Sequence, residues 1–371
     1  MELRIAIVHD WLSGMRGGEK VLEVLCELFP QATLFTLLHN KGSMSPAIER
    51  MEIRTSFVQH LPLRKTKYRS YLPLFPRAIE SFDFRPYDLI ISSSHCVAKG
   101  AQPRSGALHI CYCYTPMRYV WEMYETYFGA GRADPLIRGV MSVVAPRLRA
   151  WDVQTSDRVH SFVAISEYIA ARIQRHYQRP STVIYPPVDI QQFSVSRSDK
   201  GYYLVVSALA PYKRVDLAVG AFRRMSEPLL VVGTGTEEKK LKKIAPPNVE
   251  FLGWQSDARL AELYSGCKAL LFPGEEDFGI VPLEAMACGK PVIAFGRGGA
   301  LETVVEGGRR PTGVFFQEQT EDALISAIRR SETFPYDAGS IRLHAERFDR
   351  PRFKRTLGDF VRQKTEEFFR R

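Results

Sequence analysis

Residues 273–295, "PGEEDFGIVPLEAMACGKPVIAF", decide the fold, because they place an acidic loop and a short helix between two apolar runs. The run before them, "KALLFP" (268–273), is typical of a buried strand. "PLEAMACG" (282–289) predicts a helix, since proline suits the first turn of a helix and glycine suits its end. "PVIAF" (291–295) predicts the next strand. This order of strand, loop, helix and strand indicates a parallel sheet covered by helices.

The same alternation of apolar runs and helical periods extends over most of the chain. The double proline in "TVIYPPVDIQQF" (182–193) interrupts it, since proline cannot continue a helix or a central strand. We therefore predict an α/β fold with two Rossmann-like domains, 1–187 and 188–345, and a last segment, 346–371, that holds a basic amphipathic helix. The other predicted strands are 3–9, 88–94, 107–114 and 161–166 in the first domain and 202–209, 228–235 and 249–253 in the second.

The composition indicates an ordinary globular protein. The chain has 371 residues, 45% hydrophobic and 25% charged, which suits two domains. No apolar stretch reaches the roughly 18 residues of a spanning helix, and the start "MELRIAIVHDW" is typical of a strand and not of a signal peptide, so we expect a cytosolic protein. The net charge of +10 suits nucleic acid, an anionic membrane surface or phosphate-bearing substrates. The six cysteines form no C-x-x-C pair and are expected to be reduced and buried.

The acidic loop lies where a sheet of this kind binds ligands. Ligands of open α/β sheets lie outside the carboxyl ends of the strands, and the loop "GEEDFG" follows such an end. The N–H groups around Gly279 to Val281 open the next helix and suit an anion such as phosphate. Glu276 in the loop and Glu284 in the helix suit two parts of one extended ligand. In the alternative interpretation Glu276 is solvated and Glu284 only complements the helix dipole.

The opening stretch resembles the E-x7-E signature of retaining glycosyltransferases of the GT-B fold in family 4, with Glu276 and Glu284 at that spacing. "TPMRYVWEMYE" (115–125) is similar to a segment of a subgroup that adds mannose to lipid-linked oligosaccharides. The resemblance implies an acceptor-binding first domain that faces a nucleotide-sugar-binding second domain across a cleft, and a last helix that packs back toward the first domain. Four further segments resemble family elements in the same order: "GGEK" (17–20), "SALAPYKRVDLAV" (207–219), "VVGTGTEEKKL" (231–241) and "VEFLGWQSDARLAELYSGCKALLFP" (249–273).

The resemblance also implies roles at the matching positions. Lys213 would neutralise the charge that grows on the diphosphate of the donor as the sugar leaves. Glu276 would bind hydroxyl groups of the sugar, and Glu284 would hold the ribose. The other donor-binding positions that it implies are Gly17, Gly18, Arg214, Gly233, Gly253, Phe278, Gly279, Ile280 and Val281.

Two positions depart from the family pattern. Tyr114 stands where the family usually has a histidine that touches the donor sugar; it can donate a hydrogen bond but does not titrate near neutral pH. Ala208 stands where the family usually has an arginine on the phosphates, and Arg214 or Arg297 can substitute for it. His95 is either a catalytic replacement for the missing histidine or a structural polar residue.

The sequence holds no Asp-x-Asp pair of the kind that binds a divalent ion in other glycosyltransferases. We therefore predict that no metal and no other cofactor is required, and that Lys213, Arg214 and backbone dipoles supply the positive charge.

The acceptor side is less constrained by the sequence. Arg118 is a candidate for binding a phosphate or a sugar of the acceptor. Residues 61–78, "LPLRKTKYRSYLPLFPRA", mix cations with leucines and aromatics, and their prolines prevent one continuous helix. The segment suits a membrane surface into which Leu72, Leu74 and Phe75 insert, a nucleic acid, or plain solvent.

The resemblance therefore implies a retaining hexosyltransferase that moves a sugar, in the first place mannose from GDP-mannose, onto a hydroxyl of a growing, lipid-linked glycan. We expect it in the cytosol or peripheral on the cytosolic membrane face, with no nucleic-acid partner. Two alternatives stay open: an inactive relative that only binds a nucleotide or a glycan, which Tyr114 and Ala208 favour, and another GT-B enzyme such as a sugar-nucleotide epimerase.

Overall fold

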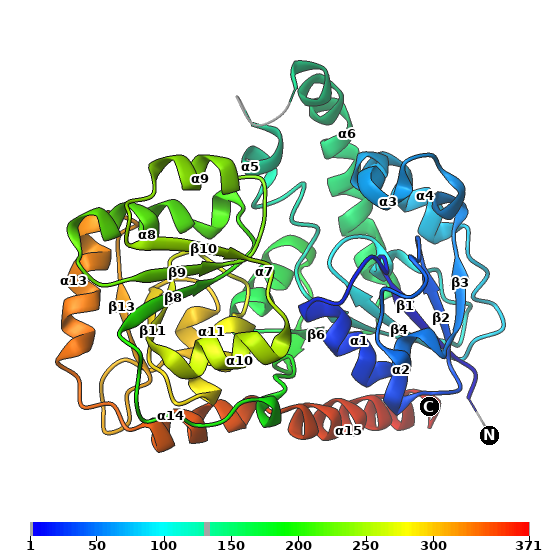
Figure 1. The fold of residues 1–371 in the computed structure, drawn as a ribbon. Helices are drawn as coiled ribbons and strands as arrows, with labels where there is room; N and C mark the ends of the chain where they lie inside the picture. The colour runs from blue at the N-terminus through cyan, green and yellow to red at the C-terminus, as the bar shows by residue number, and fades with distance from the viewer. Residues whose placement is uncertain (1–2, 130–133, 371) are drawn as a thin grey trace. The chain divides into compact units, whose positions relative to one another are not determined.

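The structure is a computed structural model and describes residues 3–129 and 134–370. The chain divides into two compact units (Figure 1). The first holds the residues up to Pro186 together with Phe353–Arg371, and the second holds Pro187–Arg352. The chain changes unit within the double proline, where no helix or central strand can continue. Each unit is a parallel sheet with helices, so the predicted fold class of two Rossmann-like domains is confirmed.

The first unit is built on a seven-stranded parallel sheet in the order β3-β2-β1-β4-β5-β6-β7. β1 is buried along its whole length, as a strand covered on both faces requires. It pairs with β2 on one side and β4 on the other, so the strand order reverses between β1 and β4. The strands are β1 (Ile5–His9), β2 (Thr33–Thr36), β3 (Glu52–Thr55), β4 (Leu89–Ser94), β5 (Leu108–Cys113), β6 (Ser161–Ala164) and β7 (Ser181–Val183).

Helices cover this sheet. The predicted helix after the first strand is present as α1, which buries Val21, Leu22 and Leu25 at helical spacing. The helices of the first unit are α1 (Gly17–Leu28), α2 (Pro46–Glu49), α3 (Arg64–Lys67), α4 (Phe75–Glu80), α5 (Tyr124–Phe128), α6 (Pro135–Gln154) and α7 (Glu167–Tyr177), with 3-10 turns η1 (Phe57–His60), η2 (Tyr68–Leu74), η3 (Ala98–Gly100) and η4 (Thr155–Arg158).

Segment 61–78 folds as short pieces, α3, η2 and the start of α4, so the prediction that its prolines prevent one continuous helix is confirmed. Leu72 and Phe75 are buried in the core of the first unit, and the ring of Phe75 lies 5.9 Å from that of Trp11. The prediction that these two side chains insert into a membrane is therefore wrong. Other apolar residues of the segment, Leu63 and Leu74, are exposed, so only part of its apolar side chains pack inward.

The second unit is built on a six-stranded parallel sheet in the order β10-β9-β8-β11-β12-β13. The strand order reverses between β8 and β11, which pair with each other. β11 and β12 flank the acidic loop and the helix predicted after it, and the two strands pair in parallel, as predicted. The strands are β8 (Tyr202–Val206), β9 (Leu229–Val232), β10 (Val249–Gly253), β11 (Cys267–Phe272), β12 (Val292–Phe295) and β13 (Gly313–Phe316).

The last helix begins in the second unit and ends in the first. From Phe353 onward it belongs to the first unit, where the Phe353 ring lies 5.8 Å from that of Tyr112 and Lys354 pairs with Glu27 at 2.9 Å. The helices of this half of the chain are α8 (Val215–Ala221), α9 (Glu238–Ile244), α10 (Asp257–Gly266), α11 (Ile280–Ala287), α12 (Ala300–Thr303), α13 (Glu321–Glu332), α14 (Ala338–Ala345) and α15 (Arg350–Phe369), with 3-10 turns η5 (Ile190–Gln192), η6 (Pro211–Lys213), η7 (Phe222–Arg224) and η8 (Glu346–Phe348).

Two sequence-based expectations bear on the surface and the core. Within the described residues, every helix is too short or too polar to cross a bilayer. All six cysteines are buried and unpaired, as expected for reduced core residues.

Candidate active site

Lys213 and Glu276 meet outside the point where the strand order of the second sheet reverses. Lys213 ends η6, which follows β8, and Glu276 lies in the loop after β11. The Lys213 ammonium donates a hydrogen bond to Glu276 Oε1 and forms an ion pair with it. The two side chains are only 18% and 16% exposed. The fold therefore brings together two residues that lie 63 positions apart and that the sequence analysis had selected separately.

Three glycines allow the backbone segments around Lys213 and Glu276 to approach each other closely. A Cβ on Gly274 would lie 2.9 Å from Cα of Lys213, so a side chain there would push the loop after β11 away from η6. The N–H of Gly299 donates to the carbonyl of Glu276 at 2.8 Å. Gly298 has φ +66°, and a Cβ on it would lie 2.4 Å from that same carbonyl oxygen. The loops after β8, β11 and β12 are thereby fastened together at Glu276.

The start of α11 lies directly after this loop. Gly279 has φ +105° and turns the chain into the helix, whose first two residues are Ile280 and Val281. The first N–H groups of a helix have no partner within it, so these residues present donors to an anion. Phe278 is 3% exposed, and its ring lies 5.9 Å from that of Phe348, so its side chain anchors the loop from inside.

Glu284 lies one turn further along α11. Its Oε2 accepts a hydrogen bond from the buried hydroxyl of Tyr264 at 2.8 Å. Burial, and then the Glu284 carboxylate, raise the pKa of Tyr264 well above its ordinary value, so Tyr264 stays a neutral donor. The Tyr264 contact fixes the direction of the carboxylate.

Gly233 directly follows β9, and Gly253 is the last residue of β10. The N–H of Gly233 donates to the carbonyl of Gly253 at 2.8 Å. Both have positive φ, and a Cβ on Gly233 would lie 1.9 Å from the carbonyl oxygen of Ser207. No side chain fits at Gly233, and the backbone at the ends of β8, β9 and β10 runs side by side.

The two arginines considered as substitutes at Ala208 differ in their surroundings. The Arg214 guanidinium donates to Gln319 Oε1 at 2.9 Å and pairs with Asp216 at 3.2 Å. Arg297 is exposed and lies in the loop after β12, next to the Gly298 that pairs with Glu276. The Arg214 guanidinium is thus held by side chains of the second unit, whereas that of Arg297 lies over the Phe295 ring, 5.7 Å from its centroid.

In the first unit, Asp10 and His95 meet outside the reversal point between β1 and β4. The carboxylate of Asp10 accepts the N–H groups of four successive residues, His95 to Ala98, at 2.6–3.0 Å. Its Oδ2 also lies 3.0 Å from His95 Nδ1. Burial alone would raise the pKa of Asp10, but the charge and hydrogen bonds of His95 prevail and lower it to about 2. The ionised Asp10 orients the imidazole, whose side chain is 25% exposed, so that Nε2 is its remaining polar atom.

Tyr114 forms a hydrogen bond with the first turn of α1, which begins with Gly17 and Gly18. Its hydroxyl donates to the carbonyl of Gly18 at 2.8 Å, and Ser93 Oγ lies 2.8 Å from the same hydroxyl. Ser93 in turn lies 3.0 Å from Nδ1 of the buried His9. Since the Tyr114 proton goes to Gly18, Ser93 donates to Tyr114 and accepts from His9. Tyr114 therefore braces the helix that starts at Gly17, and its position under Gly18 favours a positioning role.

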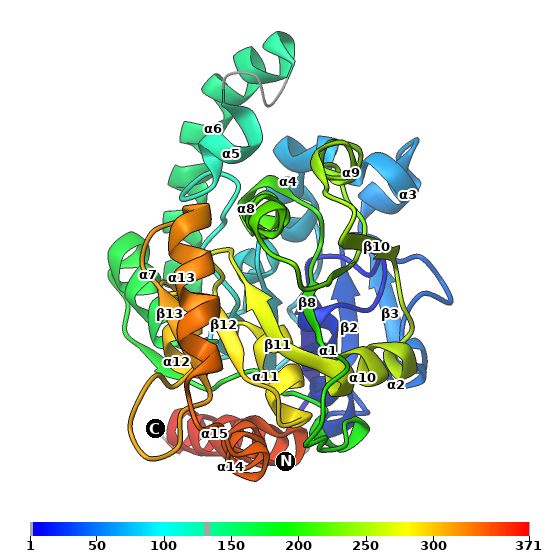
Figure 2. The ribbon, with the colours of Figure 1, turned by 60° about the vertical axis from the view of Figure 1, so that its left-hand side comes forward.

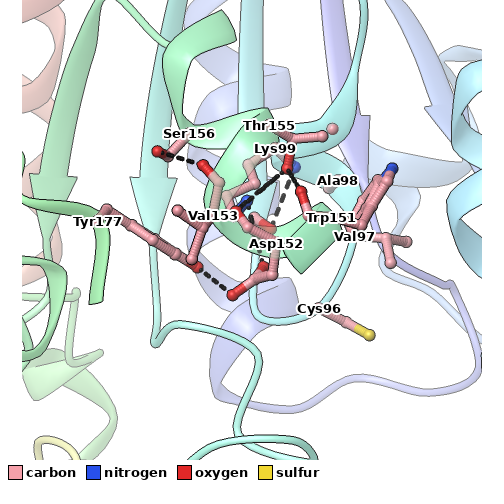
Figure 3. A network of polar contacts seen from close by, with 12 residues as sticks. Cys96, Val97, Ala98, Lys99, Trp151, Asp152, Val153, Thr155, Ser156 and Tyr177 are labelled. Atoms are coloured by element: carbon pink, nitrogen blue, oxygen red, sulfur yellow. Dashed lines mark hydrogen bonds and ion pairs between the residues drawn. The ribbon is translucent and has the colours of Figure 1, made fainter. Parts of the chain in front are cut away.

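Arg118 lies in the segment after β5, and a buried ion pair supports that segment (Figure 3). The ammonium of Lys99, 1% exposed, lies 3.2 Å from Asp152 Oδ1. The other carboxylate oxygen of Asp152 accepts from Trp121 Nε1 and from the Tyr177 hydroxyl, both at 2.8 Å. The stretch 115–125 is thereby fastened to α6 and to the turn that follows His95.

Comparison with known proteins gives the family. The protein-family model "Glycosyl transferases group 1" matches residues 189–336, and "Glycosyltransferase Family 4" matches residues 15–192. The chain belongs to the GT-B glycosyltransferases of the group 1 and family 4 type. This glycosyltransferase is similar in fold to the Anabaena protein HepE in complex with UDP and glucose, with a TM-score of 0.70 and 17% identity over 97% of this chain and 99% of that one.

Two curated relatives of this glycosyltransferase are mannosyltransferases by name. The alpha-1,3/1,6-mannosyltransferase ALG2 of Kluyveromyces lactis is 26% identical over 49% of this chain and 47% of its own. The GDP-mannose-dependent monoacylated alpha-(1-6)-phosphatidylinositol monomannoside mannosyltransferase of Corynebacterium glutamicum is 31% identical over 38% of this chain and 45% of its own. The matched stretches thus span less than half the length of these relatives.

Sequence reasoning missed several residues of this glycosyltransferase site. Asp10 and His9 carried a usable signal, because a charged pair at the end of an otherwise apolar strand is unusual. Gln319, which bridges Arg214 and the carbonyl of Pro273, carried none, since it lies more than 100 residues from its partner Arg214. Gly298, whose backbone approaches the carbonyl of Glu276, was not among the candidate residues either.

Proposed function

We propose that this protein is a retaining glycosyltransferase that moves a hexose from a nucleotide sugar to a hydroxyl group of an acceptor glycan. The observation that carries the proposal is the Lys213–Glu276 pair beside the first turn of α11. A cation, a helix N-terminus and a carboxylate at one place suit the diphosphate and the sugar of a single donor. The membership of the chain in the glycosyltransferase family supports the same reaction.

The proposed reaction breaks the bond between C1 of the sugar and the diphosphate oxygen. Negative charge grows on the diphosphate, where Lys213 and the N–H groups of Ile280 and Val281 stabilise it. The oxygen of the acceptor hydroxyl forms the new bond to C1 on the same face, and its proton passes to the leaving diphosphate. Lys213 exchanges its contact with Glu276 for the diphosphate when the donor binds, and Glu276 then accepts hydrogen bonds from the sugar hydroxyls.

The rest of the donor site is proposed from the second unit. The Glu284 carboxylate, which Tyr264 orients, accepts from the ribose hydroxyls. The backbone near Gly233 and Gly253 lies against the diphosphate and the base. Arg297 supplies the second cation that Ala208 lacks. Lys213, Arg297 and the helix dipole provide the positive charge, so the proposal needs no divalent ion and no further cofactor.

For the donor we propose GDP-mannose. The support is the names of the mannosyltransferase relatives, one of which is described as GDP-mannose-dependent. The fold neighbour HepE was solved with UDP and with UDP-glucose, so a UDP-sugar is the donor to test against it.

For the acceptor we propose a lipid-linked glycan, processed by a protein that is peripheral on the cytosolic membrane face. The Corynebacterium relative carries a phosphatidylinositol mannoside in its name, which is a sugar on a lipid. Arg118, in the segment that Asp152 holds through Trp121, is the proposed contact for a phosphate or sugar of that acceptor. His95 presents Nε2 to a substrate hydroxyl.

A second candidate is a relative that binds the nucleotide sugar but does not turn it over. Two observations favour it: Ala208 removes one cation, and the Tyr114 hydroxyl is bound to Gly18 and Ser93 within the scaffold. The catalytic proposal and this one differ in turnover and not in binding.

Glu276→Gln separates the two candidates, with Glu275→Gln in the same loop as the matched control. The catalytic proposal expects GDP-mannose hydrolysis to fall by about a hundredfold or more in Glu276→Gln while GDP binding, measured by calorimetry, is kept. Glu275→Gln should hydrolyse the donor like the wild type. A wild-type protein that binds GDP-mannose and never hydrolyses or transfers it, with any acceptor, would establish the binding-only candidate.

A further inference from the structure

The first half of α6 exposes an aliphatic face. Leu136, Ile137, Val140 and Val143 are 76%, 49%, 48% and 56% exposed. Ile137, Val140 and Val143 lie one, four and seven positions after Leu136, which places the four residues within one side of the helix. Scattered exposed leucines and valines are common on soluble proteins, but four large ones on one helical face form a patch that water solvates poorly.

Core packing does not account for this face. The residues of α6 that do pack inward, Met141, Ala145 and Leu148, belong to the hydrophobic core of the first unit. Ile137 begins their stripe at the exposed end of the helix, and Leu136, Val140 and Val143 lie beside that stripe. Figures 1 and 2 both show α6 extending outward beyond α4, past the rest of the first unit that is drawn with it. The aliphatic face is thus carried on a projecting part of the helix.

Apart from one capping aspartate, the charged residues of the sequence around this face are positive. Between Glu125 and Asp152 the one acidic residue is Asp134, and its carboxylate caps α6 by accepting the N–H of Leu136 at 2.8 Å. Arg138 and Arg147 are exposed on α6 itself. The neighbouring segment 53–79 contains no Asp or Glu at all.

Within that segment, the short helix α3 contains Arg64 and two lysines. Lys65 and Lys67 are exposed, and Leu63 beside them is 64% exposed. α3 continues into η2 and α4, whose buried residues share one hydrophobic cluster with Met141 of α6. The indole N–H of Trp151 in α6 donates to Glu80 at the end of α4 at 2.9 Å. The segment that follows α3 and the inner side of α6 therefore pack on the same hydrophobic cluster of the first unit.

We propose that this α6–α3 surface, defined as Leu136, Ile137, Val140 and Val143 with Lys65 and Lys67, docks on an anionic lipid bilayer. The aliphatic side chains enter the boundary between headgroups and acyl chains, and the lysines and arginines meet the anionic headgroups. A second copy of the chain fits less well, because both copies would bring the same positive charges to the contact. The proposal of this docking surface is based on side-chain exposure and charge, and it does not require that the protein catalyses the transfer reaction.

Vesicle sedimentation tests the surface directly. The full-length protein should pellet with vesicles of phosphatidylcholine and phosphatidylglycerol, release them as salt rises, and stay in solution with phosphatidylcholine alone. Leu136→Ser/Val143→Ser should lower the partition coefficient by about tenfold, since it removes apolar area that leaves water on insertion. Val153→Ser, an exposed aliphatic residue on the opposite side of α6, is the matched control and should bind like the wild type. Equal binding by all three proteins, or none by the wild type, would overturn the proposal.

A labelled cysteine reports insertion independently. Because all six native cysteines are buried, Val140→Cys can be labelled selectively with an environment-sensitive dye. Its emission should shift to the blue with the anionic vesicles, whereas the same label at Val153→Cys should not respond. If chromatography shows a wild-type dimer that Leu136→Ser/Val143→Ser converts to a monomer, the face is a self-association surface and the membrane proposal is wrong. Vesicle binding without donor turnover would support the surface and contradict the proposed reaction.

Discussion

His95 Nδ1 lies 3.0 Å from Oδ2 of Asp10, and the same carboxylate accepts four consecutive backbone N–H groups, beginning with that of His95 itself. Asp10 follows β1 and His95 follows β4, so the pairing of these strands brings together residues 85 positions apart. A buried carboxylate with this many donors is held rigidly and stays ionised. It fixes both the loop after β4 and the direction of the imidazole.

Asp10 should contribute to stability in a way that depends on pH. Its pKa is lowered from about 3.8 in the unfolded chain to about 2 in the fold, so its contribution is complete above about pH 4 and is lost as the pH falls toward 2. The difference in unfolding free energy between the wild type and Asp10→Asn should therefore shrink by about 2 kcal/mol between about pH 5 and pH 2. Urea titrations at several pH values measure it. A difference that stays constant over this range would contradict the ionised Asp10.

His95→Gln should lower kcat for sugar transfer by about tenfold to a hundredfold while the KM for the donor stays near that of the wild type. Glutamine keeps a polar side chain but loses the imidazole that Asp10 orients. His60→Gln, an exposed histidine in the same unit, serves as the control and should leave kcat unchanged. If His95→Gln transfers sugar as fast as the wild type, His95 is only a structural residue.

The fold could be predicted because buried parallel strands are continuous apolar runs, and the reversal points follow once two sheets are recognised. Lys213 and Glu276 were found because their segments resemble a family. Asp10 was not found, because its role depends on N–H groups of a loop that only the β1–β4 pairing brings near. Leu72 and Phe75 were misjudged, since a mixed cationic and apolar segment does not reveal which side packs on the core.

Arg297→Ala should raise the KM for the donor by about tenfold, because it removes a cation that contacts the diphosphate at the edge of the site. Arg297→Ala/Ala208→Arg should recover most of that loss, since Ala208 is exposed and an arginine there has room to reach the phosphates. Steady-state kinetics on the three proteins provide the comparison. No change in KM in the single variant would remove Arg297 from the donor site.

Gly298→Ala should be far more damaging than Gly307→Ala, although both glycines have positive φ. A Cβ on Gly298 would lie 2.4 Å from the carbonyl oxygen of Glu276, whereas a Cβ on Gly307 has nothing within 4 Å. Gly307→Ala should cost about 1 kcal/mol of backbone strain and keep full activity. Gly298→Ala should cost more and also lower kcat, because Glu276 must move. Thermal melts and turnover check both, and equal effects would contradict the clamp on Glu276.

The central claim is turnover of a nucleotide sugar at the Lys213–Glu276 pair without a metal. The measurement that tests it most directly is hydrolysis and binding of GDP-, UDP- and ADP-sugars, each with and without EDTA, by the wild type and by Lys213→Ala. The proposal predicts turnover of GDP-mannose that EDTA does not affect and that Lys213→Ala lowers by about a hundredfold. Failure to bind any of these donors, or turnover that Lys213→Ala leaves intact, would contradict it.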